Sequence, residues 1–88
     1  MRDRKQYYEY QNKLVMRIIE LIDDKVKPNN EHLKIHLYVD YLDKNSTLDR
    51  KRIKKILDME ARRLITLEEL NEIAKALGLK LYQLFEDL

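Results

Sequence analysis

The scarcity of chain-breaking residues constrains this fold more than any other feature of the sequence. The 88 residues include one glycine, Gly78, one proline, Pro28, and no cysteine. Tight hairpin turns and glycine-rich phosphate loops both need glycine, so the chain has little capacity for either. Without cysteine there are no disulfides and no thiolate metal ligands, and packing alone must hold the chain together. We therefore expect an all-α fold, and the length predicts one domain over residues 1–88.

The composition excludes several classes of protein. Apolar residues make up 44% of the chain and charged residues 39%, which suits a small core under a charged surface. The longest apolar run, Leu14-Val15-Met16, is far shorter than the roughly 18 residues of a membrane-spanning helix. We expect a cytoplasmic protein with no secretory leader and no membrane partner. Ser46 is the only serine, so we expect no enzyme activity, no catalytic residue and no cofactor.

A long helix is predicted at the start of the chain. Apolar residues recur at three- and four-residue spacing from about Arg4 to Lys27, and Pro28 cannot continue the helix. The apolar arc is wide, so this helix should have contacts on two sides. For Tyr7, Tyr8 and Tyr10 we expect rings that cover the core and hydroxyl groups in water, although these residues could also stack on bases or close a dimer interface.

Residues 31–45 allow two interpretations. Apolar and polar residues alternate from Leu33 to Tyr41, as in a half-buried strand, but the same stretch also has apolar residues at helical spacing. No other segment alternates, so a lone strand would leave its backbone groups unpaired unless a second chain supplied a partner. We predict a helix. The alternative is a two-chain ribbon that turns Lys34, His36 and Tyr38 towards a DNA groove.

Capping signals define the last third of the chain. Thr66 and Glu69 have the spacing of a capping box and predict a helix with an apolar stripe that begins at Leu67. Gly78 is placed to end this helix in a left-handed conformation. A short last helix at about 81–87 would follow.

Positive charge is concentrated on one short element. Residues 49–63 carry seven Lys or Arg against three Asp or Glu, whereas residues 64–88 carry two against five. Ser46 and Asp49 have capping-box spacing and would open a helix from about Leu48 to Glu60. Its apolar residues face inward, and the opposite face carries Arg50, Lys51, Lys54 and Lys55. A basic helix that follows another helix after a short turn indicates a helix-turn-helix unit that inserts its second helix in the major groove of double-stranded DNA.

Two stretches resemble a known family. They are Ile65-Thr-Leu-Glu-Glu-Leu-Asn-Glu-Ile-Ala-Lys-Ala-Leu-Gly-Leu-Lys-Leu-Tyr-Gln-Leu-Phe-Glu-Asp87 and Ser46-Thr-Leu-Asp-Arg-Lys-Arg-Ile-Lys-Lys-Ile56. The first resembles helices four and five, and the second the recognition helix, of the XRE-type, or Cro/C1-type, helix-turn-helix transcriptional regulators. The resemblance implies a compact five-helix, lambda-repressor-like bundle. It also implies a homodimer on a palindromic operator, acting as a repressor or an activator.

The resemblance also implies roles for individual residues. Carried over by position, Asp49, Arg50, Lys51 and Arg52 face bases or nearby phosphates, and Lys55 faces the DNA backbone. Leu48, Ile53 and Ile56 become core residues of the recognition helix. With the remaining cations of the basic segment, the candidate DNA-binding residues are Asp49, Arg50, Lys51, Arg52, Lys54, Lys55, Arg62 and Arg63.

The chain departs from the family pattern at three places. Asn29, Asn30 or Glu31 stands where the family has a phosphate-binding Gln at the start of helix two. Asn45 is the nearest candidate for the glycine of the turn, and Asp58-Met59 replaces the Asn-Gly that follows helix three. These differences weaken the expectation that the second helix docks on phosphate in the usual way.

Two other functions compete with DNA binding. A helical protein-interaction module, such as an adaptor or an antitoxin-like protein with a protein partner, would use the doubly apolar first helix and the tyrosines without reading DNA. His32 and His36, four residues apart, could hold one metal ion with Asp40 or Asp43. Because the glutamate of the metalloprotease motif is missing between them, we predict two partly exposed histidines and no metal.

Overall fold

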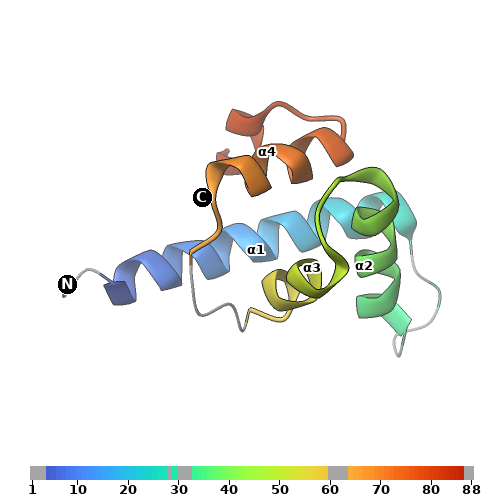
Figure 1. The fold of residues 1–88 in the computed structure, drawn as a ribbon, viewed down its shortest axis with the longest axis horizontal. Coiled ribbons are helices and arrows are strands. Elements are labelled where there is room, and N and C mark those ends of the chain that lie inside the picture. Colours follow the sequence, from blue (N-terminus) through green and yellow to red (C-terminus); the bar gives the residue numbers. More distant parts are fainter. Residues whose placement is uncertain (1–3, 28, 30–32, 60–63, 87–88) are drawn as a thin grey trace.

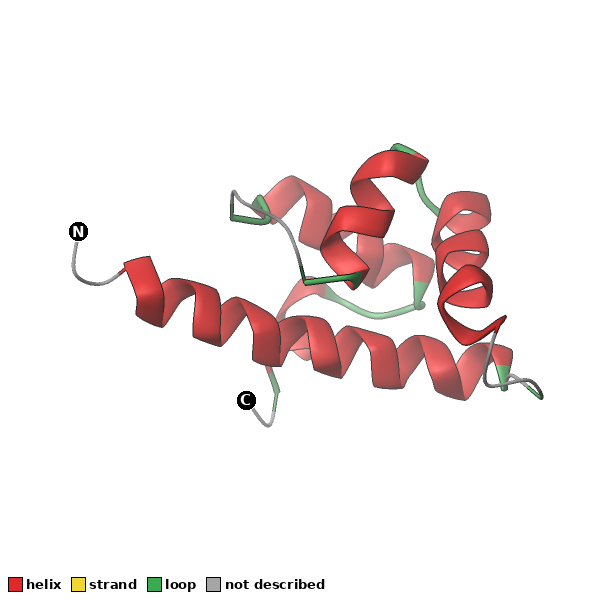
Figure 2. Cartoon of the chain, turned by 90° about the horizontal axis from the view of Figure 1, so that it is seen from below, coloured by secondary structure: helices red, strands yellow, loops and turns green. Residues whose placement is uncertain are grey.

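The computed structural model describes residues 4–27, 29, 33–59 and 64–86, and the regular structure in these ranges is all helical (Figure 1, Figure 2). Four α-helices follow one another: α1 (Arg4–Val26), α2 (Lys34–Asn45), α3 (Arg50–Leu57) and α4 (Leu67–Ala76). A 3-10 helix, η2 (Leu81–Phe85), comes last. The all-α prediction is confirmed. The short last helix has 3-10 rather than α geometry.

The long helix α1 runs the length of the molecule, and the other elements gather on it (Figure 1). Helices α2 and α3 pack on α1 from one side, η2 packs on it from the other, and α4 packs on η2 and α2. Each element contributes a fully buried aliphatic residue to one core. These residues are Ile18 and Ile22 of α1, Leu42 of α2, Ile53 of α3, Ile73 of α4 and Leu84 of η2. The predicted two-sided contact of the first helix is confirmed.

The ambiguous segment is a helix, and its burial pattern shows why. Tyr38, Val39 and Leu42 are buried at helical spacing, while Ile35, which an alternating strand would turn inward, is 37% exposed. The Tyr38 hydroxyl donates to the Asp23 carboxylate of α1 at 2.6 Å. The tertiary contacts therefore favour the helical face over the alternating one, and the strand alternative is wrong for the described part of this segment.

Both predicted signals around α4 are confirmed. The Glu69 N–H donates to the Thr66 hydroxyl at 3.1 Å, and the Thr66 N–H donates to the Glu69 carboxylate at 2.9 Å, which completes the capping box. At the other end Gly78 has a φ of 72°. The Leu79 N–H reaches back to the Ala74 carbonyl at 2.8 Å, as a Schellman motif requires.

The predicted capping box at Ser46 is wrong. Helix α3 begins at Arg50, and Asp49 precedes it without a capping hydrogen bond from its side chain. The Ser46 hydroxyl instead donates to the Leu42 carbonyl at 2.6 Å and accepts the Leu48 N–H at 3.3 Å. Ser46 thus belongs to the end of α2, because a hydroxyl that follows a helix can satisfy its last carbonyls.

A methionine occupies a backbone conformation that favours glycine. Met59 follows α3 with a φ of 57°, at the position where the resembled family has the glycine of Asn-Gly. Its side chain is 42% exposed and adds little packing to offset the steric cost of the left-handed region.

We expect Met59→Gly to raise the free energy of unfolding by about 0.5–1 kcal/mol, since relief of left-handed strain exceeds the entropy that glycine adds to the unfolded chain. The matched control is Met16→Gly, because Met16 is also exposed, at 55%, but lies in the middle of α1. Glycine is unfavourable inside a helix, so this variant should have a free energy of unfolding about 1 kcal/mol lower than the wild type. Urea unfolding of both variants checks the prediction. A loss of stability in Met59→Gly would contradict it.

Candidate nucleic-acid interface

Helix α3 separates its apolar and basic residues as the sequence predicts. Ile53, Ile56 and Leu57 are buried. The opposite side carries three exposed lysines, Lys51, Lys54 and Lys55, which we call the lysine face. None of these lysines forms an ion pair with another described residue. The lysine face is therefore the part of α3 whose positive charge is not neutralised by an ion pair with another described residue.

Arg50 lies at the start of α3 but is held by two carboxylates of α2. One terminal nitrogen lies 2.7 Å from the Asp40 carboxylate and the other lies 3.2 Å from that of Asp43. The hydrogen bond to Asp40 raises the pKa of Arg50. The Arg50 side chain is 43% exposed, so water screens this cluster and an anion could compete for the guanidinium.

Arg52 does not lie on the exposed side of α3. Its Nε donates to one Glu69 oxygen at 2.7 Å, and a terminal nitrogen donates to the other at 3.1 Å. The same terminal nitrogen reaches the Leu64 carbonyl at 3.4 Å. The side chain is only 10% exposed, so the predicted role of Arg52 at bases or phosphates is not supported by its position. It joins α3 to the start of α4.

Glu69 is the other half of this junction. It accepts both nitrogens of Arg52 and the N–H of Thr66, the residue that caps α4. The guanidinium of Arg52 is the main cause that lowers the pKa of Glu69 to about 2, and the Thr66 N–H adds to it. Arg52 and Glu69 are nearly buried and are joined by two hydrogen bonds. Such a pair fixes the position of α3 more firmly than an exposed pair would.

The turn before α3 is also tied to α4. The hydroxyl and the N–H of Thr47 donate to one Glu72 oxygen at 2.9 and 3.3 Å, and these hydrogen bonds lower the pKa of Glu72. Helix α3 is thus attached to α4 at its beginning through Thr47 and along its side through Arg52.

The remaining candidate residues divide into two groups. Asp49 is exposed just before α3, where its negative charge would repel a phosphate. The predicted contacts of Arg62 and Arg63 lie outside the described residues. The structure therefore brings Lys51, Lys54 and Lys55 together on one face, keeps Arg50 beside them on carboxylates, and removes Arg52 from the set.

The histidine metal site gains no support from geometry. His32 lies outside the described residues, and His36 is exposed. Asp40 and Asp43, the proposed additional ligands, bind Arg50 instead. Among the described residues no group of three or more His, Asp or Glu side chains is placed to hold a metal ion.

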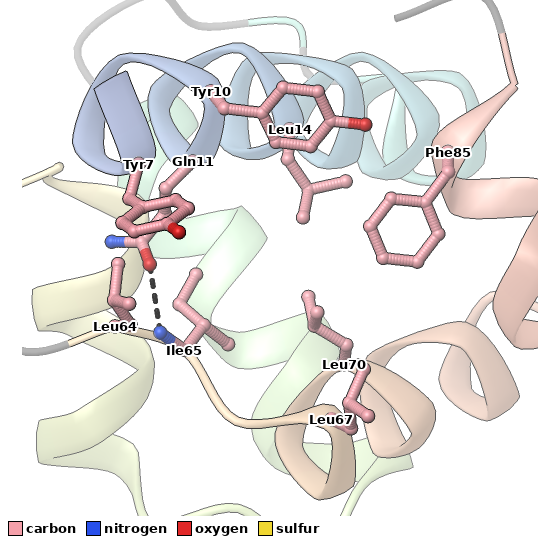
Figure 3. A pocket seen from close by; sticks show the side chains of 9 residues that line it. All are labelled: Tyr7, Tyr10, Gln11, Leu14, Leu64, Ile65, Leu67, Leu70 and Phe85. Carbon is pink, nitrogen blue, oxygen red and sulfur yellow. Dashed lines mark hydrogen bonds between the residues drawn. The ribbon is translucent and has the colours of Figure 1, made fainter. Parts of the chain in front are cut away.

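An apolar groove lies between the first half of α1 and the start of α4 (Figure 3). It has a volume of about 210 Å³, and no charged residue is among the described ones that line it. Helix α1 contributes Tyr7, Tyr10 and Leu14, α4 contributes Leu67 and Leu70, and η2 contributes Phe85. At one end the Ile65 N–H donates to the Gln11 side-chain oxygen at 2.8 Å, which joins the two walls.

The groove is open to solvent at its rim. Tyr7, Tyr10 and Leu67 are 58%, 49% and 67% exposed. The sequence prediction that the tyrosines cover the core is thus only partly right, since Tyr7 and Tyr10 line the groove and are about half exposed. The apolar helical pattern that begins at Leu67 predicts a buried side chain there, so the sequence did not indicate the exposure of Leu67. Leu67 is the first residue of α4 and directly follows the N-cap residue Thr66. At this end of the helix the side chain lies beyond the core and is exposed.

Comparison with known proteins adds no assignment: no family model, curated protein or solved structure matches the chain. Among the described helices, none has the length and apolar character needed to cross a membrane.

The charge on Glu69 should make stability depend on pH in a defined window. A carboxylate with a lowered pKa stabilises the fold above its unfolded value of 4.5, and the contribution is lost as the pH falls towards about 2. We expect the wild type to lose about 2–3 kcal/mol between pH 5 and pH 2 that Glu69→Gln does not lose. The check is urea unfolding of both proteins across this range. Gln retains the hydrogen-bonding pattern of a capping box but not the charge, so parallel pH profiles would contradict the role of the ion pair.

Proposed function

We propose that the protein binds double-stranded DNA by placing α3 in the major groove, and that two copies on a palindromic site regulate transcription. The lysine face carries this proposal, because Lys51, Lys54 and Lys55 are exposed together on the side of α3 that faces away from the core. Helices α2 and α3 are separated by residues 46–49, and this order of two helices around a short connection supports the proposed helix-turn-helix role. The resemblance of residues 46–87 to XRE-type regulators supports the same function.

The chemistry of the face determines how such a helix would bind. An α-helix with its side chains is about 10–12 Å across, which matches the width of the major groove. Lysine is a point charge on a flexible stem and suits phosphates better than the paired acceptors of a base. The lysine face therefore supplies affinity, and sequence preference depends on Arg50, whose planar group can bind guanine at two points.

The carboxylates around α3 limit this affinity. Asp40 and Asp43 neutralise Arg50, and Asp49 and Asp58 are exposed at the two ends of the helix. We expect weak binding at physiological salt by a single copy, because few cations remain to neutralise phosphates. Two copies on one site would then be needed for specific binding.

The salt dependence of DNA binding tests the lysine face. If three lysines neutralise three phosphates, the logarithm of the binding constant should fall with the logarithm of salt with a slope of about −3 per copy. Replacing Lys51, Lys54 and Lys55 together by Gln should bring the slope close to zero for any duplex sequence. Fluorescence anisotropy with a labelled duplex at several salt concentrations measures both.

The matched control replaces Lys25, Lys75 and Lys80, which are exposed on other surfaces, by Gln. This control variant has the same net charge as the lysine-face variant. It should nevertheless keep the salt slope of the wild type to within about one unit. A wild-type protein that binds no duplex even at low salt, or a control that loses as much affinity as the lysine-face variant, would overturn the proposal.

The carboxylates of α2 offer a second test. Asp40→Asn with Asp43→Asn should free Arg50 and remove repulsion from phosphates, so affinity should rise by roughly tenfold at low salt. The gain should vanish when Arg50→Ala is added. Asp24→Asn, which removes an exposed carboxylate of α1, is the control and should leave affinity unchanged. A fall in affinity with the Asn pair would mean that the carboxylates hold Arg50 in its binding position.

The apolar groove favours a second candidate, a helical protein-interaction module that does not read DNA. A contiguous apolar surface with a polar surround is typical of a binding site for another protein. This candidate is favoured if the protein binds no duplex while a defined protein partner binds in stoichiometric amount. Leu67→Glu should then abolish binding of that partner.

A further inference from the structure

The groove between α1 and α4 keeps apolar side chains in contact with water. Nine described residues line it, and all of them except Gln11 have aliphatic or aromatic side chains (Figure 3). The side-chain oxygen of Gln11 already accepts the N–H of Ile65. A ligand that covers this surface therefore gains free energy by removing apolar area from water.

The size of the groove distinguishes a small molecule from a protein. A stable protein interface takes about 20–30 residues on each side, many more than the nine described residues of the groove. The volume of the groove is about 210 Å³. An apolar cavity of roughly 150 Å³ binds one benzene molecule, so this groove has room for one or two fused rings.

The lining side chains define the chemistry of such a ligand. Tyr7 and Tyr10 of α1 and Phe85 of η2 present three aromatic rings to the hollow (Figure 3). Aromatic rings attract a further ring, edge to face or offset, beyond the gain from burial alone. No charged residue is among the described ones that line the groove, so an ionised ligand would lose hydration without gaining a partner. We infer that the groove binds a small, neutral aromatic compound of about the size of indole.

One wall of the groove is also part of the support of α3. The Leu64 carbonyl accepts a terminal nitrogen of Arg52 at 3.4 Å, and the next residue, Ile65, bonds to Gln11 of α1. A ring in the groove would contact the side chains of both Leu64 and Ile65. Binding should therefore be sensed at Arg52. The ligand site stands apart from the proposed function, and only an effect of the ligand on DNA binding rests on it.

Titration of the full chain with indole, followed by amide NMR spectroscopy without DNA, tests the site. We expect saturable binding with a dissociation constant of about 1 mM or lower, as is usual for a compact apolar ligand of this size. The largest shifts should fall on Gln11, Ile65 and Leu70, which line the groove. At saturation the Nε–H signal of Arg52 should shift, whereas that of Arg50, whose carboxylate partners lie on α2, should not.

A matched pair of variants tests the aromatic contacts. Tyr10→Ala should weaken indole binding by at least about fivefold, because it removes one ring from the groove. Alanine favours a helix, so this variant should remain folded, which circular dichroism checks. The control is Tyr82→Ala, because Tyr82 is an exposed ring of η2 that does not line the groove. It should bind indole like the wild type.

A charged analogue tests the neutrality of the ligand. Indole-3-carboxylate should bind at least about fivefold more weakly than indole, because no described lining residue offers a positive charge to its carboxylate. Equal affinity for the two compounds would contradict this requirement.

Several results would overturn the inference. One is the absence of saturable shifts, or shifts spread evenly over the surface. Another is an equal loss of affinity in Tyr10→Ala and Tyr82→Ala. A groove that takes up no indole but is covered by another protein chain would be a third. An Arg52 signal that stays unchanged at saturation would defeat the link to α3.

The ligand site and the DNA proposal fail separately in these measurements. A protein that binds indole with the expected variant pattern, but binds no duplex, would uphold the groove site and defeat the DNA proposal. Duplex binding with the predicted salt slope, and no uptake of indole, would do the reverse.

Discussion

The carboxylate of Glu69 connects α3, the helix of the lysine face, with α4. It caps α4 together with Thr66, and it binds Arg52 of α3 at two points. The orientation of α3, and with it the direction of the lysine face, therefore depends on a charge in another helix. The pair is almost dry, at 10% and 14% side-chain exposure, so its two members stabilise the structure only while both are present.

The most basic segment of the chain offers much less free positive charge than its composition suggests. Arg52 serves the interior, and Arg50 is shared between two carboxylates of α2. What remains is the lysine face, whose flexible charges attract any polyanion and discriminate little between sequences. Under the proposed function, the distinction between general DNA binding and specific regulation would therefore lie in whether Arg50 exchanges Asp40 and Asp43 for a base.

Local signals in the sequence predicted most of the fold, and long-range contacts account for most of the errors. The capping box at Thr66 and the left-handed Gly78 depend on residues within a few positions, so their spacing was sufficient. The helical state of 34–45 needed the argument that a lone strand has no partner. The pairing of Arg52 with Glu69 joins residues 17 positions apart and leaves no periodic trace. Ser46 had the right spacing for a cap but served the preceding helix instead, because one hydroxyl can satisfy either end.

The join between Gln11 and Ile65 spans 54 positions of the chain, which has a consequence for how the protein is made. During translation α1 emerges first, and at about 5–20 residues per second the opposite wall of the groove follows roughly 3 to 10 seconds later. For seconds, then, the α1 segment lacks the elements that bury its apolar stripe in the complete fold, and these contacts supply most of the stability of a protein helix. Chaperone capture or aggregation of nascent chains would begin on that stripe.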